Sequence, residues 1–332
     1  MLTCHDKIVI YGIGEIFMAI KKITIAGGGI LGSQIAYQAA YCGYDVTIWL
    51  RNEESVKRTK AKIDNLRQIY DATINLMDTP EGKTKENWAI GIPSPDGFNK
   101  DECLLRSSRA HFGIKLVTDL ASSVKDADLL IESITEDENA KINFYKKVAD
   151  LLPEKTLIVT NSSTFLPSKF AKYTKRPSKF LSLHFANEIW KNNTAEIMAH
   201  DKTDNQFFIE IMEFSKTLRM LAIPVSKENP GYVVNSMLIP FLFSAVDLYV
   251  KGTSDFKSID IAWKSATGMP EGPFEIIDKV SLTTAYIIAK KYEKIPSFLA
   301  PYNFKKICAL LKKYIDEGKT GRDAGEGFYK YK

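Results

Sequence analysis

Apolar and polar positions alternate with two different periods along the first two thirds of the chain. Short apolar runs, typical of buried strands, are separated by longer segments with the three-to-four-residue spacing of amphipathic helices. The predicted strands are 23–26, 46–50, 114–118, 127–132, 156–160, 180–183 and 221–225. The predicted helices between them are 30–42, 53–70, 120–126, 138–152 and 205–218. Strands that alternate with helices in this order predict an α/β fold with a doubly wound, mostly parallel sheet.

Two stretches depart from this alternation. Residues 78–110 are rich in Pro, Gly, Asn and Asp without clear periodicity, and we expect a long excursion from the sheet. After Pro230-Gly231 the strand pattern ends, and 232–317 is expected to form helices joined by short turns. The first of them, Tyr232–Val250, is apolar on most faces, as in helices buried against other helices. The pattern therefore predicts a sheet domain over 21–226 and an all-helical domain over 227–332.

Residues 1–20 precede the first predicted strand. The stretch 8–20 is apolar apart from Glu15, but it lacks the basic start and the small-residue cleavage site of a secretory leader. We interpret 1–20 as an extension outside the core fold, with a peripheral strand or helix as the alternative. No apolar run reaches the roughly 18–20 residues that a membrane helix needs, so no membrane association is expected.

A glycine motif joins the first predicted strand to the first helix. Its spacing is Gly27-x-Gly29-x-x-Gly32, and Ile30 and Leu31 fill the positions between the last two glycines. In a strand–turn–helix–strand unit, such glycines permit a tight turn, a close approach of backbone to pyrophosphate, and close helix packing. The phosphates then lie at the helix N-terminus. The motif predicts a Rossmann-type dinucleotide-binding domain, although a glycine turn without a ligand is the alternative.

The end of the second predicted strand lacks the acidic residue that usually binds the ribose 2′-hydroxyl of NAD. Leu50 stands at that position and is followed by Arg51. An arginine there can pair with the 2′-phosphate of NADP, because its planar fork suits phosphate oxygens. NADP is therefore favoured over NAD. Two alternatives stay open: Arg51 is a solvated loop charge, or Glu53 and Glu54 bind the hydroxyl.

Composition narrows the class of protein. The 332 residues carry a formal net charge of +5 from scattered Lys and Arg, which suits anionic ligands but does not indicate nucleic acid. The four cysteines (Cys4, Cys42, Cys103 and Cys308) lie far apart, so we expect a reduced, cytoplasmic setting. The four histidines have no metal-binding spacing, so no metal site is expected.

Polar residues follow two of the predicted strands, where the ligand crevice of a doubly wound sheet is found. The run 160–164 (TNSST) follows one strand, and His184 ends the next, with Glu196 twelve positions later. A carboxylate beside an imidazole favours its charged form and fixes its orientation, as acid–base catalysis requires. The hydroxyls and the amide of the 160–164 run can bind a substrate oxygen or only cap the next turn. The amide of Asn235, on the helix after Pro230-Gly231, can donate to a carbonyl oxygen or accept from a hydroxyl.

These motifs together resemble the 3-hydroxyacyl-CoA dehydrogenase family from about residue 21 to residue 330. The matching segments are GGGILGS, IESITE (131–136), NSST (161–164), LHFAN (183–187), NNTAEIM (192–198), PGYVVN (230–235), GPFEIID (272–278) and GKTGRDAGEGFYKY (318–331). The stretches LGSQIAYQAAYCGYDVT and LHFANEIWKNNTAEIM look closer to the diketoreductase branch, which reduces β-diketo esters.

The resemblance implies a role for each candidate residue. Ser163 corresponds to the serine that binds the substrate hydroxyl, His184 to the catalytic base and Glu196 to the partner of that histidine. Asn235 corresponds to the asparagine beside the substrate oxygen. The resemblance also places Glu132, Glu136 and Asn187 along the cofactor pocket. Trp190 is expected either to wall the substrate pocket or to pack in the core.

The implied activity is a reversible interconversion of 3-hydroxy and 3-keto groups with NAD or NADP, as in fatty acid metabolism, by a homodimer. The substrate is a small 3-keto or 3-hydroxy molecule. The segment HFANEIW replaces the usual HFFNPVP, which leaves open whether the substrate carries CoA. The basic helix 53–70 overlaps the CoA-binding region of acyl-CoA members, and a solvated charged face is the alternative interpretation of its Lys and Arg residues. A non-catalytic dinucleotide sensor or a structural relative of the family is the alternative.

Overall fold

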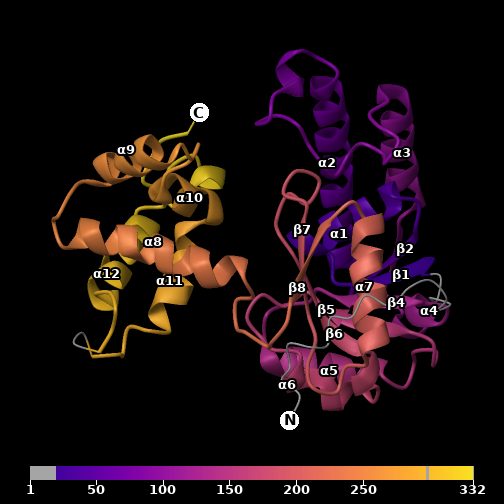
Figure 1. Cartoon of the computed structure of the whole chain (residues 1–332). Helices are drawn as coiled ribbons and strands as arrows, with labels where there is room; N and C mark the ends of the chain where they lie inside the picture. Colours follow the sequence, from indigo (N-terminus) through magenta and orange to yellow (C-terminus); the bar gives the residue numbers. More distant parts are fainter. Residues whose placement is uncertain (1–19, 297–298, 332) are drawn as a thin grey trace, which may run out of the picture. The chain divides into compact units, whose positions relative to one another are not determined.

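The structure is a computed structural model that describes residues 20–296 and 299–331 (Figure 1). The predicted N-terminal extension, 1–20, therefore lies outside the described residues except for Ile20. Contacts within the chain divide it into a first unit that ends at Tyr232 and a second that begins at Val233. This division lies a few residues beyond the predicted boundary at 226, and Tyr232 belongs with the sheet because its side chain packs there.

The first unit is built on an eight-stranded sheet with the order β3-β2-β1-β4-β5-β6-β7-β8. Strands β1 to β6 are parallel, β7 is antiparallel to β6, and β8 is parallel to β7. Their bounds are β1 Lys22–Ala26, β2 Asp45–Trp49, β3 Lys115–Val117, β4 Leu129–Glu132, β5 Leu157–Thr160, β6 Phe180–Phe185, β7 Thr194–Met198 and β8 Leu221–Val225. Every residue of β4, β5 and β6 is buried, as expected for central strands covered on both faces.

Helices cover both faces of this sheet. Their bounds are α1 Ile30–Tyr41, α2 Glu53–Met77, α3 Lys100–Gly113, α4 Leu120–Val124, α5 Glu138–Val148, α6 Ser168–Ala171 and α7 Asn205–Thr217. Alternate residues of β4 show the two layers: Leu129 and Ile131 belong to the core beneath α1, α2 and α7, whereas Leu130 packs with α5. Short polar side chains cap α2, α3, α4, α5 and α7, as Asn52 does for α2.

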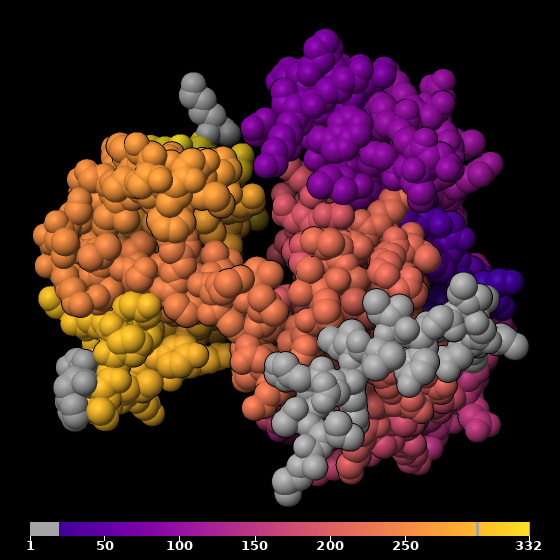
Figure 2. Space-filling view, in the orientation of Figure 1, coloured from indigo at the N-terminus to yellow at the C-terminus, as the bar shows by residue number. Residues whose placement is uncertain are grey.

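Helix α3, strand β7 and the four-residue helix α6 were not expected from the sequence. The excursion 78–110 contains the start of α3, whose buried side is made of the small residues Cys103, Ser107 and Ala110. Such a stripe produces little apolar periodicity. Strand β7 was missed because its central residue is the charged Glu196. Helix α2 also runs to Met77 rather than to residue 70, and with α3 it forms the violet projection of the first unit (Figure 2).

The second unit is helical. It contains α8 Val234–Val250, α9 Phe256–Thr267, α10 Pro273–Val280, α11 Leu282–Lys290 and α12 Phe304–Asp316. A core of aromatic and aliphatic side chains from these helices also holds Phe328 of the C-terminal segment. The buried carboxylate of Asp278 accepts hydrogen bonds from the backbone N–H groups of Phe328 and Tyr329 at 2.8 and 2.9 Å. The predicted α/β fold, a Rossmann-type sheet followed by an all-helical domain, is thus confirmed.

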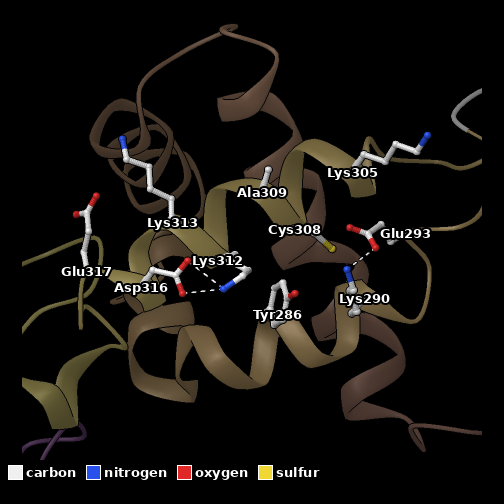
Figure 3. Close-up of a pocket in the computed structure, with 10 residues that line it drawn as sticks. All are labelled: Tyr286, Lys290, Glu293, Lys305, Cys308, Ala309, Lys312, Lys313, Asp316 and Glu317. Atoms are coloured by element: carbon white, nitrogen blue, oxygen red, sulfur yellow. Dashed lines mark hydrogen bonds and ion pairs between the residues drawn. The ribbon is translucent and has the colours of Figure 1, made fainter.

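An open groove lies between α11 and α12, with a volume of about 540 Å³ (Figure 3). Charged side chains line much of it. Lys290 is paired with Glu293 at 2.6 Å and Lys312 with Asp316 at 2.7 Å. These lysine charges are therefore largely neutralised by carboxylates close to them in the sequence.

Candidate active site

The antiparallel pairing of β6 with β7 places His184 directly opposite Glu196. Their side chains meet on the same face of the sheet, with His184 Nδ1 and Glu196 Oε2 3.1 Å apart. Both side chains are buried, so the carboxylate is shielded from competing water. A buried carboxylate at Nδ1 fixes the ring and favours a proton there, which leaves Nε2 as the nitrogen that exchanges a proton.

Ser163 lies at the other nitrogen of this ring. It follows β5, which is parallel to β6, so the carboxyl ends of the two strands lie at the same edge of the sheet. The Ser163 Oγ and His184 Nε2 atoms are 3.1 Å apart. The structure therefore brings together three of the four predicted catalytic side chains, in the order Ser163, His184, Glu196.

The face of the histidine ring is covered by Tyr232, which sequence reasoning did not single out. The two rings stack with centroids 4.5 Å apart and planes 11° apart. Tyr232 Oη donates to the carbonyl of Ser162 at 2.7 Å, and burial raises the pKa of this hydroxyl, so it stays a donor. The backbone of Tyr232 has a positive φ of 56°, after Gly231 at 85°. The only hint of this conformation in the sequence was Gly231, directly before the aromatic Tyr232.

Glu136 holds the loop on both sides of Ser163. One of its oxygens accepts from the hydroxyl of Ser162, and from the N–H and hydroxyl of Thr164 at 3.0 and 2.8 Å. The other lies 3.2 Å from the ammonium of Lys141. Burial acts to raise the pKa of Glu136, but the Lys141 charge and these hydrogen bonds outweigh it and lower that pKa. The carboxylate is thus kept ionised as an anchor for the loop.

Glu132 is buried inside the sheet unit, whereas the family resemblance implies a place along the cofactor pocket. Its side chain is 0% exposed. Lys141 lies 2.6 Å from one carboxylate oxygen, and the hydroxyls of Tyr145 and Thr160 donate to the other at 2.8 Å each. Both of its carboxylate oxygens therefore have partners inside the protein. Lys141, itself buried, bridges Glu132 and Glu136 and was missed because it lies inside an amphipathic helix.

The glycine motif forms the turn between β1 and α1. Gly27 has a φ of 108°, and a Cβ built on it would lie 2.5 Å from the carbonyl oxygen of Ser133. A Cβ on Gly32 would lie 2.2 Å from the oxygen of Gly27, so the chain itself requires both glycines. A Cβ on Gly29 would meet nothing within 4 Å. The open side of the turn, at the N-terminus of α1, fits a dinucleotide pyrophosphate.

The other predicted cofactor residues differ in exposure. Ile30 is 67% exposed in the first turn of α1, and Leu31 is half-buried. Leu50 is only 3% exposed and packs against the glycine turn, whereas Arg51 is exposed. Asn187 is exposed in the loop between β6 and β7. The glycine motif thus forms a turn with free space beside Gly29. The residues that follow β2 are the apolar Leu50 and the cationic Arg51.

Trp190 lies in the main core of the sheet unit. Its ring centroid is 5.5 Å from that of Tyr70, and the side chain is buried. Of the two alternatives from the sequence, this geometry supports core packing rather than a substrate wall. Asn235 lies in the first turn of α8, in the second unit, and its proximity to the substrate oxygen stays a prediction.

Two general features concern ligands and membranes. Within residues 20–296 and 299–331, no group of three or more His, Cys, Asp or Glu side chains is arranged to bind a metal ion. Over the same residues, no helix is both long and apolar enough to span a bilayer.

Comparison with known proteins identifies the family. The model of the 3-hydroxyacyl-CoA dehydrogenase NAD binding domain matches residues 22–88 and 102–229, and that of the C-terminal domain matches 231–331. A probable 3-hydroxyacyl-CoA dehydrogenase of Caenorhabditis elegans is 32% identical, over 94% of this chain and 93% of the relative. The human mitochondrial hydroxyacyl-coenzyme A dehydrogenase is 31% identical, over 94% and 92%.

Solved structures agree with this assignment. A diketoreductase described in connection with dual catalysis of dicarbonyl compounds is 39% identical, with a TM-score of 0.80, over 95% of this chain and 100% of its own. A 3-hydroxybutyryl-CoA dehydrogenase from Ralstonia eutropha is 25% identical, with a TM-score of 0.71, over 95% and 100%. The chain belongs to the 3-hydroxyacyl-CoA dehydrogenase family, oxidoreductases that interconvert 3-hydroxy and 3-keto groups with a nicotinamide dinucleotide.

Proposed function

We propose that His184 is the acid–base residue of this oxidoreductase, with Ser163 and Glu196 as its immediate partners. The observation that carries the proposal is the line of contacts through the ring, 3.1 Å from Nδ1 to Glu196 and 3.1 Å from Nε2 to Ser163. In this arrangement Glu196 holds Nδ1 of the ring, and Nε2 lies beside the hydroxyl of Ser163. A protein that only senses a dinucleotide has no need of it.

In the direction of reduction, the bound cofactor supplies a hydride to the 3-carbon of the substrate. The imidazolium of His184 gives its Nε2 proton to the oxygen on which negative charge develops, and Glu196 stabilises the imidazolium. The hydroxyl of Ser163 donates to the same oxygen. The family resemblance assigns Asn235 to that oxygen too. Removal of one such donor commonly costs about 3 kcal/mol of transition-state stabilisation.

The loop and ring contacts give this chemistry a fixed frame. Tyr232 covers one face of the imidazole, and Glu136 anchors the residues on either side of Ser163. In this proposal Glu132 supports the site from below through Lys141 rather than by touching the cofactor. Gly27, Gly29, Ile30, Leu31, Gly32 and Asn187 remain the candidates for direct cofactor contact.

NADP is the cofactor that we favour over NAD. The buried Leu50 offers no acceptor for a ribose 2′-hydroxyl, and the exposed Arg51 offers a cation to a 2′-phosphate. The substrate is a small 3-keto or 3-hydroxy compound. Relatives named for acyl-CoA substrates and a diketoreductase named for dicarbonyl compounds support thioesters, acids and esters as the candidates to compare.

A cytoplasmic homodimer that takes part in fatty acid metabolism is the proposed setting. Apolar side chains on the surface of the second unit support a self-association surface there, since Met237, Ile261 and Ile287 are each more than half exposed. A molar mass in solution near twice that of the chain is the expected result of light scattering.

Steady-state kinetics test the proposed activity. We expect turnover of acetoacetyl-CoA, a free β-keto acid or a diketo ester, each measured with NADH and with NADPH, and a higher kcat/KM with NADPH. Cofactor binding without turnover of any of the three substrates would contradict the proposal and favour a nucleotide sensor. A structural relative would show neither turnover nor tight binding.

A further inference from the structure

The first turns of α2 carry the cationic side chains Arg58 and Lys62, for which the glycine motif gives no role. The end of β2 is closed by Leu50, which packs against the middle glycine of the turn, Gly28. Thr59 and Lys62, one turn apart on α2, reach the carbonyl of this same glycine, with donor–acceptor distances of 3.2 and 3.3 Å. The ammonium of Lys62 therefore lies beside the glycine turn, on the side that faces α2.

Arg58 lies on the same side of α2, one turn before Lys62. Its Nη2 donates to Ser55 Oγ at 3.3 Å, and that hydroxyl donates to the capping side chain of Asn52 at 2.8 Å. The guanidinium is thus linked to the residue that directly follows Arg51. Because 55, 58 and 62 recur at the three-to-four-residue spacing of a helix, these side chains lie along one stripe of α2.

A phosphate group can replace Glu54 as the partner of Arg58. Its guanidinium pairs with Glu54, but the two side chains are 51% and 75% exposed. An exposed ion pair of this kind contributes little free energy, because water screens it and both side chains lose freedom. A phosphate group accepts two parallel hydrogen bonds from arginine and competes well for the same guanidinium.

We propose that Arg51, Arg58 and Lys62 together bind the 2′-phosphate of NADP(H), and that α2 thereby sets the choice of cofactor. This inference rests on the proposed preference for NADP over NAD and adds two residues to Arg51. The pyrophosphate lies at the N-terminus of α1 and is common to NAD and NADP, whereas the ribose of a Rossmann-type site lies at the end of the second strand. Asn52, the N-cap of α2, follows that end directly.

Glu54 is the internal competitor in this arrangement. It holds Arg58 when no phosphate is present and adds a negative charge beside the phosphate when one is bound. Glu54→Gln should therefore increase the preference for NADPH, which is the opposite of the effect of removing either cation.

The first experiment compares kcat/KM for NADPH and NADH in Arg58→Gln and Lys62→Met. Loss of a hydrogen bond to a charged group commonly corresponds to about tenfold in affinity or more. We expect a loss of this size with NADPH and no change with NADH. The matched control is Lys60→Met, because Lys60 lies on the exposed side of the same helix, paired with Asp64 at 3.0 Å. Lys60→Met should leave kcat/KM unchanged with both NADPH and NADH.

An equal loss with both cofactors would overturn the proposal, because it would assign these cations to the shared pyrophosphate or to helix stability. Unchanged kinetics with NADPH in both variants would overturn it too. Thermal unfolding of each variant shows whether α2 remains folded.

A second experiment needs no turnover and so separates this inference from the proposed activity. Calorimetry compares adenosine 2′,5′-bisphosphate with adenosine 5′-monophosphate, which differ only in the 2′-phosphate. Tighter binding of the bisphosphate, lost in Arg58→Gln and kept in Lys60→Met, supports the site even if no β-keto substrate is turned over. Equal affinities of the unmodified protein for the two nucleotides would overturn it.

Discussion

His184 is an ordinary histidine in the sequence, and its surroundings make it a candidate for catalysis. Its ring is held at Nδ1 by Glu196, at Nε2 by Ser163 and on one face by Tyr232. We predict that His184→Ala lowers kcat by about 10²–10⁴-fold, the usual contribution of a positioned proton donor, and leaves cofactor affinity unchanged. Single-turnover kinetics and cofactor titration measure the two effects. A variant with near-normal kcat would exclude His184 as the acid–base group.

Glu136 gives a prediction that depends on pH. Its pKa is lowered in the folded protein, because Lys141 and the hydrogen bonds of the loop outweigh the effect of burial. Its contribution to stability is therefore fully present above the ordinary value of 4.5 and is lost as the pH falls through the lower folded pKa. The difference in unfolding free energy between the unmodified protein and Glu136→Gln should be constant above pH 4.5 and shrink below it.

The same variant separates two roles of Glu136. If the residue positions Ser163 through Ser162 and Thr164, Glu136→Gln lowers kcat and leaves cofactor affinity intact. If its carboxylate binds the cofactor, as the family resemblance implies, the dissociation constant of the cofactor rises instead. Denaturant titration across pH and cofactor titration at neutral pH provide both measurements.

At the scale of elements, Arg176, in the segment before β6, caps the C-terminal end of α5. Its guanidinium donates to the carbonyls of Leu152 at 3.1 Å and Ala149 at 3.3 Å, which follow the last turn of this helix. We predict that Arg176→Ala lowers the free energy of unfolding by about 1–3 kcal/mol, because these partly buried carbonyls lose a charged donor. Urea unfolding measures the change, and Lys175→Ala, at an exposed neighbouring position, is the control. Equal stability of both variants would show that the cap is dispensable.

Elements with a clear apolar period were predictable, and the others were not. The strands 23–26, 156–160 and 221–225 follow from short apolar runs, and their structural counterparts lie within a residue of these bounds. The sequence did not predict helix α3 because the buried side of this helix consists of small residues. It did not predict β7 because a charged residue lies at the centre of this strand. The charged residue at the centre of β7 faces His184, so its polarity fits the proposed catalytic pairing.

At the scale of the whole chain, the predicted α/β class and the helical second part follow from the order of strand and helix signals. The pairing of His184 with Glu196 does not follow from their spacing of twelve residues. It requires the antiparallel register of β6 and β7, which only the folded sheet defines. The resemblance to a known family suggested the roles proposed for these residues. The covering of the ring by Tyr232 depends on the fold, because the two residues are 48 positions apart.

Tyr232 has one further consequence, for recombination between related genes. It is the last residue of the first unit, yet its ring lies on the histidine of the sheet. A chimera that exchanges the helical unit with that of a relative keeps its own residue beside His184 only if the crossover falls after position 232. A crossover at the end of β8, which looks equally convenient in an alignment of secondary structure, would import the donor's residue into this contact.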